Sequence, residues 1–135
     1  MDKLFVDTNI VIDLLSKRES FYEEAQELFT LADTGNIKLY ISALTFANTH
    51  YLLSRHLSFS ETRKILIKFK ILVTVLSIDD KILELALTSD LKDFEDAIQY
   101  HTALENNLDI IIARNKKDFK SSALPIMTAK EYLKR

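Results

Sequence analysis

Short apolar segments alternate with longer amphipathic segments along the whole chain. The short segments are rich in branched apolar residues, which is typical of strands buried on both faces of a sheet. They predict strands at residues 3–6, 38–41, 72–76, 109–113 and 125–127. The longer segments repeat apolar residues at helical spacing. They predict helices at residues 9–16, 20–34, 42–55, 60–70, 79–89 and 94–106, and another from residue 129.

Alternation of strands and helices indicates an α/β fold. We expect a central parallel sheet of four to five strands between two layers of helices, with right-handed crossovers. A chain of 135 residues with 47% hydrophobic content is long enough for one domain with its own core, so we assign residues 1–135 to a single domain. The single glycine and single proline exclude the glycine-rich phosphate loops of nucleotide-binding folds.

Composition narrows the setting in which the protein works. The chain has no cysteine, which excludes a disulfide framework and a thiolate zinc site and fits a reducing cytoplasm. The first residues lead directly into a strand, so we expect neither a signal peptide nor a membrane span. The net charge of −2 gives no basic surface for nucleic acid, although a metal-dependent nuclease tolerates this because bound cations offset its carboxylates.

Acidic and amide side chains follow two of the predicted strands and open one predicted helix. Asp7 comes directly after the first strand, at the edge where open α/β sheets bind ligands, and its partly buried carboxylate would be costly unless paired or metal-bound. Asp93 and Asp96 open the helix that leads to the fourth strand, and Asn115 and Asp118 follow that strand. Such a cluster, without cysteine or a histidine pair, suggests Mg²⁺ or Mn²⁺.

Several of these residues also have a structural explanation. Asp93 and Asp96 can cap a helix and interact with its dipole. Asn115 favours a turn, and Thr8 and Asn9 can cap the helix after the first strand. For Thr8 and Asn9 we favour the capping role. For the aspartates and Asn115, the combination of these segments in one chain favours the functional interpretation over the structural one.

Other polar and aromatic residues are predicted to have ordinary roles. Asp13 falls inside an amphipathic segment, so we expect it to be solvated. The histidines lack the spacing of a metalloprotease site and receive no catalytic role. Four aromatic residues suit the core faces of helices, namely Phe46, Tyr51, Phe69 and Tyr100.

Four segments, spread over nearly the whole chain, are shared in order with a known family. They are Phe5-Val6-Asp7-Thr8-Asn9, Ile41-Ser42-Ala43-Leu44-Thr45, Asp93-Phe94-Glu95-Asp96-Ala97 and Arg114-Asn115-Lys116-Lys117-Asp118-Phe119. Together they resemble the PIN domain, and in particular the VapC-type toxins of bacterial toxin–antitoxin pairs. The resemblance implies a three-layer α/β/α fold, a ribonuclease site that depends on Mg²⁺ or Mn²⁺, a cognate antitoxin that wraps the toxin, and a homodimer.

The resemblance also assigns roles to individual residues. Asp7 matches the first metal-binding acid and Asp96 the central acid, while Asn115 and Asp118 match the region of the last acidic position. Asp93 matches an additional acid of one subgroup. The implied chemistry is hydrolysis of RNA phosphodiester bonds by metal-activated water, with Asp93 or Asp118 as the proton acceptor.

One position departs from the family pattern. Many members have a glutamate three residues after the threonine of the Ser-x-x-Thr motif, and this chain has Asn48. An amide in place of the glutamate removes one negative charge. This should weaken cation binding and could limit the site to one metal ion. Asn48 therefore keeps open an alternative, a catalytically weak or inactive PIN-like domain that binds RNA or a protein.

Two further alternatives fit the sequence less well. A phosphatase with Asp7 as nucleophile would need a second aspartate two residues later, where this chain has Asn9. A phosphoacceptor receiver domain would need an acidic pair before Asp7 and a lysine at the end of a late strand. A metal-dependent endoribonuclease remains the function that the sequence favours.

Overall fold

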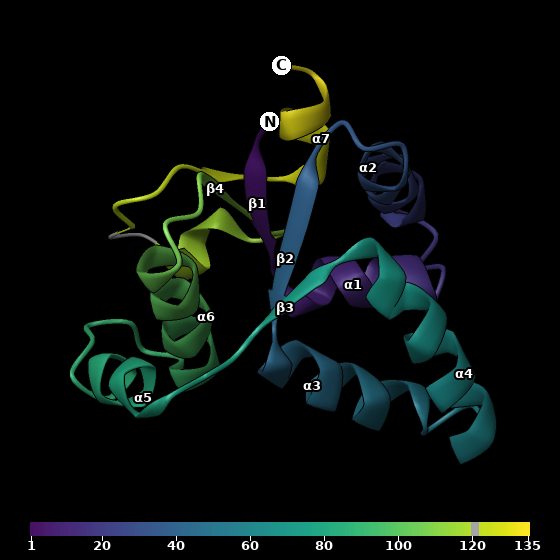
Figure 1. The fold of residues 1–135 in the computed structure, drawn as a ribbon, viewed down its shortest axis with the longest axis horizontal. Helices are drawn as coiled ribbons and strands as arrows, with labels where there is room; N and C mark the ends of the chain where they lie inside the picture. The colour runs from purple at the N-terminus through teal and green to yellow at the C-terminus, as the bar shows by residue number, and fades with distance from the viewer. Residues whose placement is uncertain (120–121) are drawn as a thin grey trace.

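All five strands run parallel in one sheet, as the sequence predicts. The structure is a computed structural model that describes residues 1–119 and 122–135. Its strands are β1 (Lys3–Val6), β2 (Lys38–Ser42), β3 (Thr74–Leu76), β4 (Ile110–Ile112) and β5 (Ile126–Met127). They lie in the order β3-β2-β1-β4-β5, so the first strand is central and is paired with β2 and β4 (Figure 1).

Helices cover both faces of this sheet, which confirms the predicted three-layer α/β/α architecture. They are α1 (Thr8–Leu15), α2 (Tyr22–Asp33), α3 (Ala43–Leu53), α4 (Phe59–Phe69), α5 (Asp80–Leu87), α6 (Phe94–Glu105) and α7 (Ala129–Leu133), with the 3₁₀ turns η1 (Lys70–Leu72) and η2 (Lys116–Phe119). Helices α5 and α6 lie on one side of the sheet and α1, α2 and α7 on the other (Figure 1). Within the described residues, no helix combines the length and the apolar character that a membrane span requires.

The central strand is buried on both faces. Leu4 and Val6 pack with Leu28 of α2, and Phe5 faces the other layer, where it packs with Ala103 of α6. The sequence of such a strand is continuously apolar because helices cover both faces of the sheet.

Capping residues define where the helices around the sheet edge begin. Ser42, predicted as a cap, accepts a hydrogen bond from the backbone N–H of Thr45 at 3.3 Å. For α4 the prediction of Ser60 as the cap is wrong. Ser58 takes that position and forms a capping box with Glu61, in which each side chain accepts a hydrogen bond from the other residue's backbone N–H.

The four aromatic residues predicted for the core divide into two groups. Phe46 and Phe69 pack against each other with ring centroids 6.0 Å apart, and Tyr100 packs in the layer of α6. Tyr51 is 67% exposed, so its prediction is wrong. Because Thr49 and Leu53 occupy the buried face of α3, Tyr51 lies on the opposite face.

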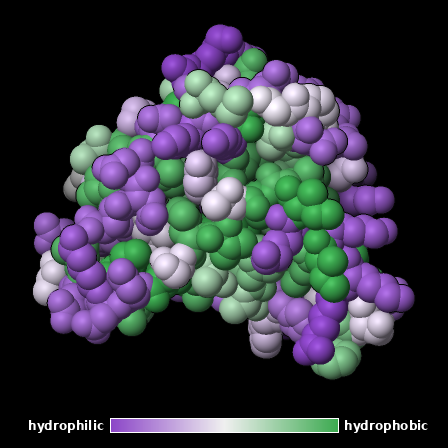
Figure 2. Space-filling view, in the orientation of Figure 1, coloured by the Kyte–Doolittle hydropathy of each residue, from purple (hydrophilic) through white to green (hydrophobic). Residues whose placement is uncertain are grey.

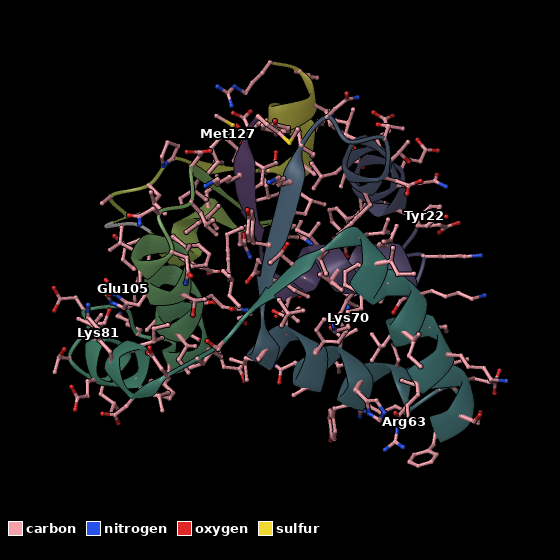
Figure 3. All side chains as sticks on the ribbon, viewed as in Figure 1. Tyr22, Arg63, Lys70, Lys81, Glu105 and Met127 are labelled. Carbon is pink, nitrogen blue, oxygen red and sulfur yellow. The ribbon has the colours of Figure 1, made fainter. Side chains whose placement is uncertain are left out.

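Two surface features distinguish the sides of the molecule. An ion pair of 2.6 Å between Lys81 and Glu105 joins α5 to the end of α6 (Figure 3). On the opposite side, hydrophobic side chains gather around the end of α4 and η1, where Ile67 and Ile71 are exposed (Figure 2). The apolar surface thus lies on a helix remote from the ion pair.

Asp13 is buried, contrary to the prediction that it is solvated. Its side chain is 1% exposed and forms an ion pair with Arg114, which follows β4, while the guanidinium of Arg18 lies 3.6 Å away. The Arg114 guanidinium also lies 4.2 Å from the centre of the Phe21 ring. This pair connects α1 to the carboxyl end of β4. Helical periodicity could not predict it, because the partner of Asp13 lies 101 positions away in the sequence.

Replacing Arg114 should therefore destabilise the fold. We expect Arg114→Met to lower the free energy of unfolding by about 2–4 kcal/mol, because it leaves the Asp13 carboxylate buried without its main partner. The matched variant Arg18→Met removes a more exposed arginine and should cost at most about 1 kcal/mol. Urea denaturation of both variants measures the difference, and equal losses would contradict a structural role for the Asp13–Arg114 pair.

Candidate active site at the carboxyl edge of the sheet

Asp7 lies where β1 ends and α1 begins. Its backbone N–H donates to the carbonyl of Ile112 at 3.0 Å, so the β-ladder with β4 fixes its position. The side chain is only 7% exposed, and none of the ion pairs in the described part of the chain includes it. Burial raises the pKa of Asp7 to about 6, and the charge of Asp118 adds to this, while backbone N–H groups of Thr8 and Asn9 oppose it.

Asp96 lies in the first turn of α6 and faces the same edge of the sheet. Burial raises its pKa to about 7, and the negative charges of Asp93, Asp7, Asp118 and Glu95 raise it further, in that order. Charges affect each other's titration in this way only when they lie near one another. The carboxylates that the sequence placed in three separate segments therefore converge.

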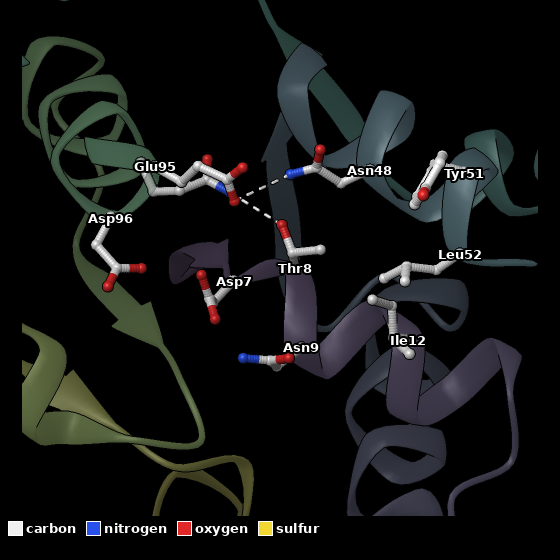
Figure 4. Close-up of a pocket in the computed structure, with 10 residues that line it drawn as sticks. Asp7, Thr8, Asn9, Ile12, Asn48, Tyr51, Leu52, Glu95 and Asp96 are labelled. Atoms are coloured by element: carbon white, nitrogen blue, oxygen red, sulfur yellow. Dashed lines mark hydrogen bonds between the residues drawn. The ribbon is translucent and has the colours of Figure 1, made fainter. Parts of the chain in front are cut away.

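A cavity of about 300 Å³ lies between these elements. Asp7 and Asp96 line it from two sides, and their carboxylates turn toward the same space (Figure 4). Glu95 and Asn48 line it further along, where the Asn48 amide donates to the Glu95 carboxylate at 3.4 Å. Tyr51, expected in the core, lines this cavity instead.

A second cavity, of about 600 Å³, lies on the other side of Asp96. Asp96 lines both cavities, whereas Asp93 and Asp118 line only the second, together with the side chains of Lys92 and Lys117. The predicted site is therefore divided between two adjoining hollows, with Asp96 at their common wall.

Structural explanations hold for two of the predicted site residues. The Asp93 carboxylate accepts a hydrogen bond from the Asp96 backbone N–H at 3.0 Å, so it caps α6. Asn115 lines neither of the two cavities, and its carbonyl accepts from the Asp118 N–H at 3.2 Å in the turn after β4. Catalytic or metal-binding roles for Asp93, Asn115 and Asp118 stay predictions.

A buried glutamine holds the site together and was not predicted. Gln99 accepts a hydrogen bond from the Ser42 hydroxyl at 2.6 Å. Its amide donates to the hydroxyls of Thr45 at 2.9 Å and Thr8 at 3.1 Å. The prediction that Thr8 or Asn9 caps α1 is wrong, because Asp7 takes the N-cap position and the Thr8 hydroxyl joins this network.

One signal in the sequence points to this network. Gln99 follows Asp96 by three positions, so the two residues lie on the same side of α6. A glutamine on that side, next to the apolar residues Ala97 and Ile98, has to satisfy its amide inside the protein. The partners of that amide cannot be found from the sequence, since they come from three other elements.

Removing the Gln99 amide should loosen the site and the fold together. We expect Gln99→Met to lower the free energy of unfolding by about 2 kcal/mol, because it leaves buried hydroxyls without their partner. Thr102→Val is the matched control on the same helix, since the Thr102 hydroxyl donates only to the Ile98 carbonyl, and it should cost under about 1 kcal/mol. Chemical denaturation compares them, and an equal or smaller loss for Gln99→Met would refute the network's role.

The donor set fits a hard divalent cation. Asp7 and Asp96 offer carboxylate oxygens, which Mg²⁺ and Mn²⁺ prefer, and the buried Asp7 forms no ion pair within the described residues, although the charge of Arg114 lowers its pKa slightly. Within residues 1–119 and 122–135, no three Asp, Glu, His or Cys side chains are already grouped around one point. Mg²⁺ commonly takes one or two carboxylates and keeps several waters, so this pair suffices for such an ion.

Comparison with known proteins identifies the family. A family model described as the PIN domain matches residues 3–117. The chain belongs to the PIN domain family. This confirms the resemblance predicted from the four segments, which lie at the end of β1, at the end of β2, at the start of α6 and after β4. A search of curated proteins finds no match to the chain.

Solved structures of similar fold come from toxin–antitoxin systems. A chain of a toxin–antitoxin complex from Klebsiella pneumoniae has 27% identity and a TM-score of 0.70, over 93% of this chain and 97% of that one. VapBC-1 from nontypeable Haemophilus influenzae has 20% identity and a TM-score of 0.70, over 95% and 98%. Mycobacterium tuberculosis VapC20, described as a sarcin-ricin loop cleaving toxin, has 17% identity and a TM-score of 0.67, over 85% and 92%.

The raised pKa values predict how stability of this PIN domain depends on pH. Asp7 and Asp96 bind protons more tightly in the folded than in the unfolded state. Their stabilising contribution is therefore complete below about pH 4 and is lost as the pH rises through 6 to 7. Without divalent cations, we expect the free energy of unfolding to fall between about pH 4 and about pH 7.

The variant Asp7→Asn tests the cause of this loss. At pH 8 it should be more stable than the wild type by about 2–3 kcal/mol, because the amide carries no charge to bury. Urea denaturation in EDTA at several pH values measures this, with Asp33→Asn at the exposed end of α2 as the control. A wild type whose pH dependence matches that of Asp7→Asn would contradict the prediction.

Proposed function

We propose that this PIN domain is a metal-dependent endoribonuclease and the toxin of a type II toxin–antitoxin pair. The observation that carries the proposal is the placement of Asp7 and Asp96 over one cavity, with Asp7 buried and in none of the ion pairs of residues 1–119 and 122–135. A buried carboxylate in that state is costly, and a divalent cation would offset its charge. Membership of the PIN domain family supports a nuclease in particular.

Asp7 and Asp96 would hold the ion. The end of β1 fixes the position of Asp7, and the first turn of α6 fixes that of Asp96. Bound Mg²⁺ or Mn²⁺ would supply an activated water and would offset the charge that develops on the phosphate. Asp118, which lies in the turn after β4 near both acids, is the candidate for a further ligand or proton acceptor, and Asp93 is the alternative acceptor. Asn115 would contribute at most an outer ligand from the same turn.

The surroundings of the site suit a nucleic-acid strand. Lys92 and Lys117 line the second cavity, where they can contact phosphates. Tyr51 presents an exposed ring beside the first cavity, on which a base can stack. The description of VapC20 as a sarcin-ricin loop cleaving toxin supports RNA as the substrate class.

The partners follow from the same relatives. Several structures of this fold are described as toxin–antitoxin or VapBC complexes, which supports a cognate antitoxin for this chain. Exposed side chains such as Ile67 and Ile71 provide apolar surface for a protein partner, either an antitoxin or a second copy in a homodimer. An RNA target and an antitoxin partner would place the protein in the cytoplasm.

One observation favours a second candidate function. Asn48 contributes no charge, and the described residues contain no preformed group of three ligands. A domain that binds RNA or protein without cutting would need neither. Titration with Mn²⁺ separates the two functions, since a binding-only domain has no need of the ion.

Cleavage of a structured RNA pool tests the proposed function. With Mg²⁺ or Mn²⁺ we expect internal cuts, and EDTA should abolish them. Asp7→Asn and Asp96→Asn should each lower the rate at least about 100-fold, because each removes a ligand charge worth several kcal/mol in the transition state. Asp33→Asn should cleave like the wild type. Cutting that survives in Asp7→Asn, or that needs no metal, would refute the proposal.

A further inference from the structure

Glu95 brings a third carboxylate to the cavity that Asp7 and Asp96 line. It is the second residue of α6, directly before Asp96, and its side chain is exposed. Neighbouring positions on a helix face different directions, yet both Glu95 and Asp96 reach this cavity. They can do so because the first turn of α6 is directed at it (Figure 4).

Asn48 holds the Glu95 carboxylate over the cavity. The Asn48 amide, on α3, donates to Oε2 of Glu95 at 3.4 Å, across a separation of 47 positions (Figure 4). This bond is near the long limit for a hydrogen bond, so it orients the carboxylate without binding it tightly. A carboxylate in that state can turn toward a cation that enters the cavity.

The charges around the cavity call for such a cation. Glu95 lines the same cavity as Asp7 and Asp96, so three carboxylates border one space. Independently, Asp7 is more than nine-tenths buried at the base of the cavity and has no ion pair among the described residues. A buried, uncompensated carboxylate points to a positive ligand in a way that surface acids alone do not.

We propose that Glu95 supplies the third carboxylate of the metal site and that Asn48 is its positioning residue. This inference rests on the proposed function and adds a ligand to it. It also explains the neutral side chain at position 48, because a carboxylate there would face Glu95 at hydrogen-bond distance and repel it. Glu95 of α6 thus supplies the negative charge that Asn48 lacks.

Binding of Mn²⁺ to the full chain, measured by calorimetry and by the signal of free Mn²⁺ in electron paramagnetic resonance, tests this assignment. We expect Glu95→Gln to raise the Kd for Mn²⁺ about tenfold. Glu27→Gln, an equal change on the exposed face of α2, should leave the Kd unchanged. The exchange variant Asn48→Glu/Glu95→Gln returns a carboxylate to the cavity from α3 and should recover most of the affinity.

Asn48→Ala tests the positioning role separately. It should weaken Mn²⁺ binding in the wild-type background by about threefold and have no further effect in the Glu95→Gln background, because its action passes through Glu95. Equal effects in both backgrounds would overturn the positioning role.

Failure of the inference differs from failure of the proposed function. If the wild type binds Mn²⁺, Asp7→Asn does not, and Glu95→Gln binds like the wild type, then Glu95 is no ligand although the nuclease site stands. If the wild type binds no Mn²⁺, both proposals are overturned.

Discussion

Parallel pairing of the central strands is the constraint on which the site depends. β1 lies between β2 and β4, and the register aligns Leu4 with Leu39 on one side and with Ile110 on the other. All three strands therefore end at the same edge, so the residues that follow them meet without any long loop. Asp7 and Ser42 come from two of these strand ends, and α6 delivers Asp96 and Gln99 to the same edge.

The two buried acids Asp7 and Asp13 differ in whether the protein compensates their charge. Asp13 is almost completely buried but has an arginine beside it, so its charge is satisfied within the protein. Asp7 is nearly as buried and, in the part of the chain that the structure describes, has no such partner. Protein folding alone gives no reason to leave that second charge uncompensated, since a neutral residue would cost less. This difference is what supports Asp7, and not Asp13, as a ligand in the proposed metal site.

Local patterns predicted the strands, most helix limits and the meeting of Asp7 and Asp96 at one cavity, because each depends on residues close in sequence and on the general rule that parallel strands end together. What the patterns missed depends on distant partners. Burial of Asp13 requires Arg114, 101 positions away, and the role of Gln99 requires Thr8, 91 positions away. The same limit explains Tyr51, because the sequence does not show which face of α3 the neighbouring elements cover.

The position of Asp96 on the wall between two cavities bears on where in a polymer the site can act. A strand lying across this carboxylate has open space on both sides, about 300 Å³ toward α3 and about 600 Å³ toward η2. Neither side ends in a closed pocket that would demand a free terminus. In the proposed nuclease, such geometry would suit an attack in the interior of a chain, with one fragment left in each cavity.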